Sequence, residues 1–211
     1  MTEQPPPTVP APTTRRRPWP VAIVALALLA YISLNTLRAD GPGSTGPDPG
    51  ARLPPFAAPL VTSTLEGDAN VATGREQGDA GARPACDVDD PRALNSCTFA
   101  REGPVVLAFV TGGAARCTRV VDAMERVAPR FPSVRFAAVA IKGSRDELRA
   151  LVRARRWTLP VAHDRDGAVA NRYGIAVCPT VVLARRGGEV VETVLGDAVA
   201  TPSRLSARVR R

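Results

Sequence analysis

The chain has 211 residues, 45% of them apolar, which is enough for one ordinary domain with a buried core and additional tails. Its net charge of +8 would indicate nucleic-acid binding only if the basic residues were clustered. Apart from short groups at 15–17 and 204–211 they are scattered, and no aromatic side chains are interleaved with them. The composition therefore disfavours a nucleic-acid partner.

The first distinctive segment is apolar. Residues 21–37 contain no charged side chain and follow Arg15–Arg17. A helix of about 17 to 25 apolar residues crosses a bilayer, and its basic flank stays in the cytoplasm. A cleaved signal peptide is the alternative, but no clean small-x-small site follows the run. We therefore expect a cytoplasmic tail over 1–17, a single-pass anchor in the cell membrane over 18–37, and an extracytoplasmic C-terminal domain.

The next segment is poor in residues that a core could bury. Residues 38–52 are mostly Gly, Pro, Ser and Asp, so we expect a flexible stalk there. The folded domain is then predicted over 53–211, with its core at 104–196. Near its start, two short β-prone runs flank Glu66–Asp68, which predicts a hairpin.

The remaining chain alternates between strand and helix patterns. Predicted strands cover 104–110, 134–141 and 159–162. Helices are predicted after the first strand, after the Ser144 and Glu147 capping box, after the Asp164–Gly167 turn, and from about Pro202. A hairpin turns at Gly187–Gly188. This order predicts a mixed α/β sheet flanked by helices.

Several residues in this order match a known family. The matching positions are Asp164, Asp166, Gly167, Tyr173, Gly174, Pro179 and Thr180. With the strand and helix order, they resemble the thioredoxin-like fold in its membrane-anchored, exported TlpA-type (redoxin) branch. The resemblance implies a thioredoxin-like mixed sheet preceded by one transmembrane helix, a cis peptide bond before Pro179, thiol-disulfide chemistry without a cofactor, and protein thiols or disulfides of the cell envelope as partners.

The turn that carries the family's Cys-x-x-Cys motif is degenerate. Ala114 stands in place of the first cysteine, and only the second, Cys117, remains. Gly113 replaces the family's Trp, and Val120 replaces an acidic residue common in relatives. A thiol one turn inside a helix is usually buried and gains less from the helix dipole than one at its first residue. Cys117 alone does not replace the lost pair.

Cys178 offers a second thiol for this site. It directly precedes Pro179, and in the fold that the resemblance implies this loop runs beside the redox turn. The resemblance therefore makes Cys117 and Cys178 the candidate catalytic pair, with Pro179, Thr180 and Arg116 shaping the site. Arg116 either stabilises the neighbouring thiolate or is an ordinary exposed helix arginine.

The other two cysteines flank an Asp-Asp-Pro turn. Cys86 and Cys97 are close enough in sequence to face each other across a hairpin or compact loop, so we expect a structural disulfide. A second redox pair feeding electrons to Cys117 is the alternative. Four cysteines allow three pairings, and their spacing does not choose among them.

Metal binding is not indicated. No cysteines have the spacing of a zinc or copper site, and His163, the single histidine, is expected at the surface beside an acidic turn. A one-cysteine peroxidase of the peroxiredoxin type would need Thr or Ser three residues before the cysteine, where this chain has Ala114.

Three hypotheses follow. The chain is an exported thiol-disulfide oxidoreductase with the pair Cys117 and Cys178, a redox-inert binding or scaffold module with two structural disulfides, or a one-cysteine peroxidase.

Overall fold

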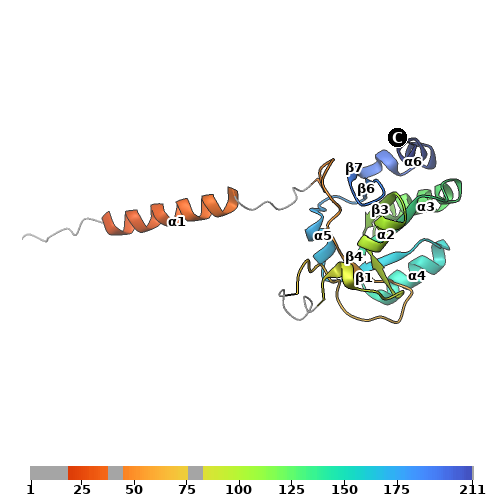
Figure 1. Ribbon diagram of the computed structural model, residues 1–211, viewed down its shortest axis with the longest axis horizontal. Helices are drawn as coiled ribbons and strands as arrows, with labels where there is room; N and C mark the ends of the chain where they lie inside the picture. Colours follow the sequence, from red (N-terminus) through yellow and green to blue (C-terminus); the bar gives the residue numbers. More distant parts are fainter. Residues whose placement is uncertain (1–18, 38–44, 76–82, 211) are drawn as a thin grey trace, which may run out of the picture. The chain divides into compact units, whose positions relative to one another are not determined.

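The computed structural model describes residues 19–37, 45–75 and 83–210, and the chain forms two compact units, Met1–Asp40 and Gly41–Arg211 (Figure 1). The described part of the first unit is one helix, α1 (Trp19–Leu37). Within the described residues, no helix combines the length and the hydropathy needed to cross a membrane. The tail predicted over 1–17 lies outside the described residues.

The second unit is built on a five-stranded sheet of order β5-β4-β3-β6-β7. Its strands are β3 (Val105–Val110), β4 (Arg135–Ile141), β5 (Val161–Asp164), β6 (Thr180–Ala184) and β7 (Val190–Leu195). β3, β4 and β5 are parallel, whereas β6 is antiparallel to β3 and β7 is antiparallel to β6. The predicted mixed sheet is confirmed, because parallel strands joined by helices precede a tight closing hairpin.

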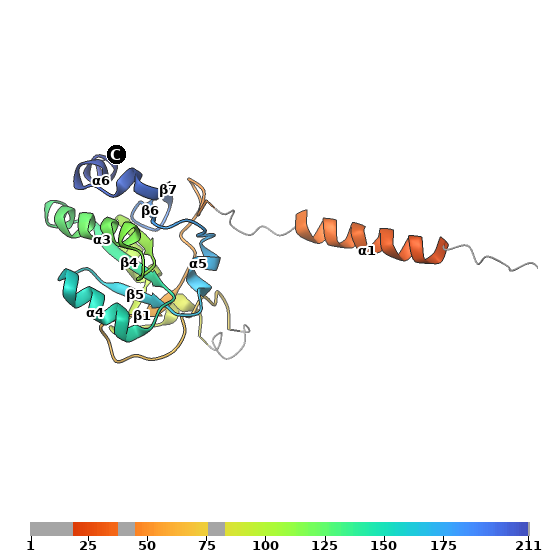
Figure 2. The same ribbon diagram turned by 180° about the vertical axis from the view of Figure 1, so that it is seen from behind.

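Helices cover both faces of this sheet (Figures 1 and 2). α3 (Ala115–Val127), α4 (Arg145–Arg155) and α6 (Pro202–Val209) pack on one face, and α2 (Ser96–Glu102) and α5 (Ala168–Arg172) pack on the other. Alternate residues of β3 belong to the two cores, with Val106 in the first and Leu107 in the second. Since both faces are buried, the strand is a continuous apolar run rather than an alternating one.

The segment before this sheet differs from the prediction. β1 (Ala57–Pro59) pairs with β2 (Ala93–Asn95) in a separate two-stranded antiparallel sheet. The hairpin predicted about Glu66–Asp68 is wrong, since across that turn only Ala57 and Asn70 form a bridge. The described residues also include the short 3-10 helices η2 (Ala85–Asp87), η3 (Ala128–Arg130) and η4 (Gly196–Val199).

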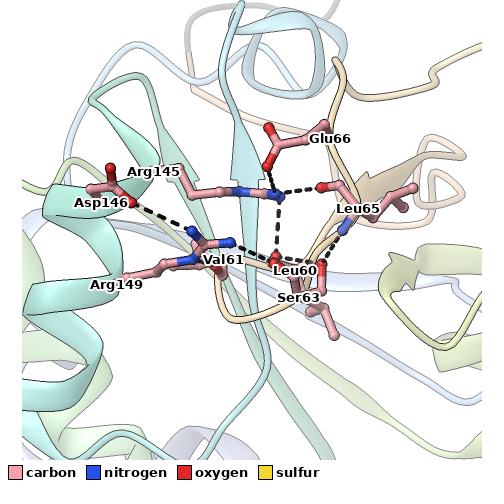
Figure 3. Close-up of polar contacts among 8 residues, drawn as sticks. All are labelled: Leu60, Val61, Ser63, Leu65, Glu66, Arg145, Asp146 and Arg149. Atoms are coloured by element: carbon pink, nitrogen blue, oxygen red, sulfur yellow. Dashed lines mark hydrogen bonds and ion pairs between the residues drawn. The ribbon is translucent and has the colours of Figure 1, made fainter.

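Two arginines of α4 bind the loop where the hairpin was predicted (Figure 3). Their guanidinium groups donate hydrogen bonds to backbone carbonyls of this loop: Arg145 to Leu60 and Leu65, and Arg149 to Val61 and Ser63. Arg145 also pairs with the carboxylate of Glu66 at 2.9 Å. The side chain of Arg145 is only 10% exposed, so these contacts fix the loop against α4.

The second half of the segment 38–52, predicted to be a flexible stalk, is bound to the domain. Residues 45–52 lie along the domain, where the amide of Gly50 donates to the carbonyl of Val190 at 2.8 Å and the hydroxyl of Thr193 donates to the carbonyl of Pro47 at 2.7 Å. The reason is that β7 is an edge strand whose free backbone groups bind this segment. Residues 38–44 lie outside the described residues.

Candidate active site

Two distant cysteines meet at one end of the central strands. Cys117 is in the first turn of α3, which follows β3, and Cys178 lies two residues before β6. The antiparallel register pairs Phe109 with Thr180, so the end of β3 lies beside the start of β6. The structure joins Cys117 and Cys178 in a disulfide with a Cα–Cα distance of 5.4 Å, inside the usual range for such bonds.

The two sulfur-bearing residues differ in exposure. Cys117 is 5% exposed and belongs to the apolar core beneath α3. Cys178 is only partly buried, and its neighbour Val177 is 41% exposed. The Cys178 end of the bond is therefore the one that another molecule can reach.

The loop that carries Cys178 has a cis peptide bond and is held by two hydrogen bonds. The Cys178–Pro179 peptide bond is cis, as the resemblance implied. The buried hydroxyl of Thr180 donates to the carbonyl of Val177 at 2.6 Å. On the other side, the amide of Gly196 donates to the carbonyl of Pro179 at 2.7 Å. These contacts fix the position of Cys178 beside α3.

Two groups of β3 and its following turn lie near the Cys178 sulfur. The hydroxyl of Thr111 donates toward this Sγ at 3.7 Å, and the carbonyl oxygen of Phe109 is 4.0 Å from it. A hydroxyl donor stabilises a thiolate, and a carbonyl accepts the proton of a thiol. Sequence reasoning missed Thr111, because only the β3–β6 register shows that it lies beside Cys178.

Arg116 forms an ion pair with Asp197. Its Nε lies 3.2 Å from Oδ2 of Asp197, and its side chain is 62% exposed. Arg119 approaches the other oxygen of the same carboxylate at 3.9 Å. The charge of Arg116 is thus partnered by the carboxylate of Asp197.

A groove of about 370 Å³ opens beside Cys178. Its apolar wall includes Ile141, Ile175 and Val177, and its polar lining comes from Thr111, Lys142, Asp166 and Asn171. Lys142 has a left-handed backbone, with φ +60°, which is unfavourable for a residue with a side chain. Strain of this kind is common at functional sites.

Asp164, in the acidic turn that matches the family pattern, has a structural role. The carboxylate of Asp164 is buried and accepts hydrogen bonds from the amides of Val169 at 3.0 Å and Ala170 at 2.8 Å, at the start of α5. Burial raises the pKa of Asp164, and these two hydrogen bonds act in the opposite direction. Asp164 therefore fixes α5, which forms one wall of the groove.

The sequence predicted that His163 lies at the surface, but the structure shows it buried. It lies within β5, is 4% exposed, and its Nε2 is 3.1 Å from the carbonyl oxygen of Gly143. The position belongs to a strand in the interior of the unit, so the acidic turn beside it did not predict its exposure. Among the residues that the structure describes, no three His, Cys, Asp or Glu side chains are grouped to hold a metal ion.

The second pair of cysteines is also bonded. Cys86 on η2 and Cys97 on α2 form a disulfide with a Cα–Cα distance of 5.4 Å. It lies near Gly187 and Gly188, at the end of β6 opposite to Cys178. The two disulfides are therefore separate features of the domain.

Comparison with known proteins agrees with this architecture. Residues 88–193 match the sequence profile of the AhpC/TSA family. A secreted Mycobacterium tuberculosis disulfide oxidoreductase homologous to E. coli DsbE is similar in structure, with a TM-score of 0.51 and 24% identity over 56% of this chain and 87% of that one. The thioredoxin domain of a Bacteroides vulgatus thiol-disulfide oxidoreductase gives a TM-score of 0.56 and 12% identity over 78% and 97%. At these identities the likeness shows a thioredoxin-like fold. No curated protein sequence matches the chain.

Proposed function

The chain belongs to the AhpC/TSA family, and on this premise we propose that it is a thiol-disulfide oxidoreductase whose working pair is Cys117 and Cys178. One observation carries the proposal. The disulfide joins a sulfur in the core to a sulfur at the wall of an open groove. Exchange requires one accessible sulfur and one that is released when the bond is attacked, and this bond has both.

The exchange begins at Cys178. A substrate thiolate attacks its sulfur, forms an intermolecular disulfide and releases Cys117 as a thiolate, which takes up a proton. A second substrate thiolate then attacks the substrate sulfur of this mixed disulfide and releases Cys178, which is protonated in turn. Two electrons pass from two substrate thiols to the protein, and the substrate leaves as a disulfide. In the reducing direction, the Cys178 thiolate attacks a substrate disulfide and Cys117 resolves the intermediate.

The surroundings favour this assignment of roles. Thr111 is placed to stabilise the Cys178 thiolate, and the fixed loop around Pro179 keeps that sulfur within reach of Cys117. The groove offers an apolar wall for a peptide together with the charged groups of Lys142 and Asp166. Protein thiols or disulfides fit such a surface better than a small solute does.

The other two hypotheses require different behaviour. A scaffold would keep the bond closed under mild reductant. A one-cysteine peroxidase would need an accessible Cys117 and a hydroxyl at position 114, whereas Cys117 is buried and bonded and position 114 is alanine.

A trapping experiment tests the proposal. In Cys117→Ser, the accessible thiol has no resolving partner, so the full-length protein should accumulate a mixed disulfide with a model peptide disulfide, mapped to Cys178 by mass spectrometry. The matched variant Cys178→Ser should trap little, because its remaining thiol is buried. Equal trapping by the two variants, or none by either, would contradict the proposal. Peroxide consumption abolished by Cys117→Ser would favour the peroxidase instead.

Export and membrane attachment are a separate part of the proposal, and they rest on the sequence. The uncharged run at 21–37 after Arg15–Arg17 supports a tether with a cytoplasmic N-terminus and a domain that meets envelope thiols. Protease treatment of intact cells and of opened cells tests it. Degradation of the domain only after the cells are opened would contradict the proposed orientation.

A further inference from the structure

The Cys86–Cys97 disulfide lines a groove of its own. Cys86 is exposed and Cys97 is half-buried. The groove has a volume of about 360 Å³ and is lined by both cysteines together with Arg52, Leu53, Pro55, Ser96, Ala100, Arg101, Gly187 and Gly188. A bond that serves only as a staple does not need such access, because its effect on the unfolded chain is the same when it is buried.

One buried side chain holds the backbone on both sides of this bond. The amide nitrogen of Asn95 donates to the carbonyls of Ala85 at 2.9 Å and Val88 at 2.8 Å, which bracket Cys86. Its oxygen accepts from the amides of Cys97 at 2.9 Å and Thr98 at 3.3 Å. Asn95 is 8% exposed, so water competes little for these four hydrogen bonds. Opening the disulfide therefore leaves the two sulfurs close enough to bond again.

The groove is positively charged. Arg52 and Arg101 both line it and are exposed, and neither forms an ion pair within the described part of the chain. The Nη2 of Arg101 donates to the hydroxyl of Thr98 at 2.9 Å, which is a neutral partner. The carboxylates next in sequence, Asp87 beside Cys86 and Glu102 beside Arg101, do not line the groove, and Glu102 is paired with Arg135. An incoming anion would therefore meet two uncompensated guanidinium groups beside the disulfide.

We propose that the Cys86–Cys97 disulfide is a second exchange site, which reacts with small thiols that carry carboxylates. The groove volume of about 360 Å³ has room for a small thiol, and the two arginines that line it select one that carries carboxylates. This site does not depend on the function proposed for the other pair. Gly187 follows β6 and Cys178 precedes it, so the length of that strand, roughly 15 to 20 Å, separates the two centres.

The reaction at this site is balanced by the thiol itself. The thiolate of the small molecule attacks the exposed Cys86 sulfur, forms a mixed disulfide and releases Cys97 as a thiolate, which is protonated. A second thiolate then attacks the small-molecule sulfur of the mixed disulfide and releases Cys86 as a thiolate, which is protonated. Two thiols are thereby oxidised to their disulfide, and the protein gains two electrons and two protons. Reaction with the small-molecule disulfide runs the same steps backwards.

Glutathione and cysteamine test this assignment in the full-length protein. Glutathione carries two carboxylates and cysteamine carries an ammonium group. Each is added at equal thiolate concentration and low ionic strength, the reaction is stopped by alkylation, and every cysteine is mapped by mass spectrometry. We expect glutathione to form an adduct on Cys86 with Cys97 alkylated, faster than cysteamine, while circular dichroism stays unchanged.

Matched variants identify the role of the charges. Arg52→Ala with Arg101→Ala should slow the glutathione reaction at Cys86 about threefold to tenfold, as expected for two exposed charge contacts. Arg126→Ala with Arg153→Ala removes the same charge from exposed positions on α3 and α4, and should leave the rate unchanged. Asn95→Asp, which loses both donors, should slow the return of the reduced pair to the disulfide.

Three results would overturn the inference. The first is a Cys86–Cys97 bond that stays closed to glutathione until the protein is unfolded. The second is equal reaction with glutathione and cysteamine, and the third is a rate insensitive to Arg52→Ala with Arg101→Ala. Because the alkylation map reports each pair separately, the reaction at Cys86 and Cys97 is scored independently of the Cys117–Cys178 pair, whose own test is the trapping of a peptide disulfide.

Discussion

The Cys117–Cys178 bond makes a quantitative prediction about stability. The two residues are 61 positions apart, and the chain-entropy model gives about 4 kcal/mol for closing a loop of that length. Cys117→Ala with Cys178→Ala should lower the free energy of unfolding by this amount. The control, Cys86→Ala with Cys97→Ala, removes a bond that closes a loop of separation 11 and should lose about 3 kcal/mol.

Urea unfolding measures both changes. For a slope of roughly 2 kcal/mol per molar urea, a loss of about 4 kcal/mol lowers the midpoint by about 2 M. Domains are typically stable by about 5 to 15 kcal/mol, so the variant should still be folded without denaturant. That point matters for function, because an exchange cycle must pass through a folded protein with both thiols reduced.

Two outcomes would refute this reasoning. If the variant without Cys117 and Cys178 is unfolded in buffer, the reduced state cannot act as an exchange partner, and the bond is a structural one. If instead the midpoint does not move, the loop-closure gain is offset within the folded protein, and the entropy model does not apply to this pair.

Three further predictions concern single positions. Asp164→Asn should remove a loss of stability that the wild type shows as pH rises from about 4, as judged by urea unfolding across pH, since the raised pKa of Asp164 means that its protonated form stabilises the folded state. Tyr173→Phe should cost about 1 to 2 kcal/mol in the same assay, because the hydrogen bond from its buried hydroxyl to the carbonyl of Pro54, 2.8 Å long, is lost. Ala114→Cys should produce a bond between position 114 and Cys117 in part of the molecules, detected by peptide mapping, since residues three apart on a first helical turn are neighbours.

Elements with a local signal were predicted correctly from the sequence. The capping box of α4 is present, with the hydroxyl of Ser144 accepting from the amide of Glu147 at 3.2 Å and the Glu147 carboxylate accepting from the amide of Ser144 at 3.1 Å. The β6–β7 turn is at Gly187–Gly188, where both residues have positive φ. In each case a few neighbouring residues contain the whole physical cause of the structure.

Errors occurred where the deciding partner is remote. The run before Glu66 has strand propensity, but its backbone pairs with β2 and with β5, and Arg145 and Arg149 of α4 bind its carbonyls. The glycine-rich residues 45–52 look like a free linker, but the open edge of β7 binds their backbone. Propensity describes what a segment can form alone, and these outcomes depend on segments far along the chain.

The candidate site combines both situations. Cys117 and the cis-proline can each be recognised in a short stretch, whereas their proximity depends on the register that pairs Phe109 with Thr180. Because the partner of Cys117 is Cys178 and not a residue of the same turn, reduction also has a different effect on the domain. A Cys-x-x-Cys bond closes a single turn, so opening it frees little of the chain, but the bond between Cys117 and Cys178 ties α3 to the loop before β6. Opening it removes a constraint between two layers of the fold, so in this protein the redox state and the packing of α3 against the sheet are coupled through one covalent bond.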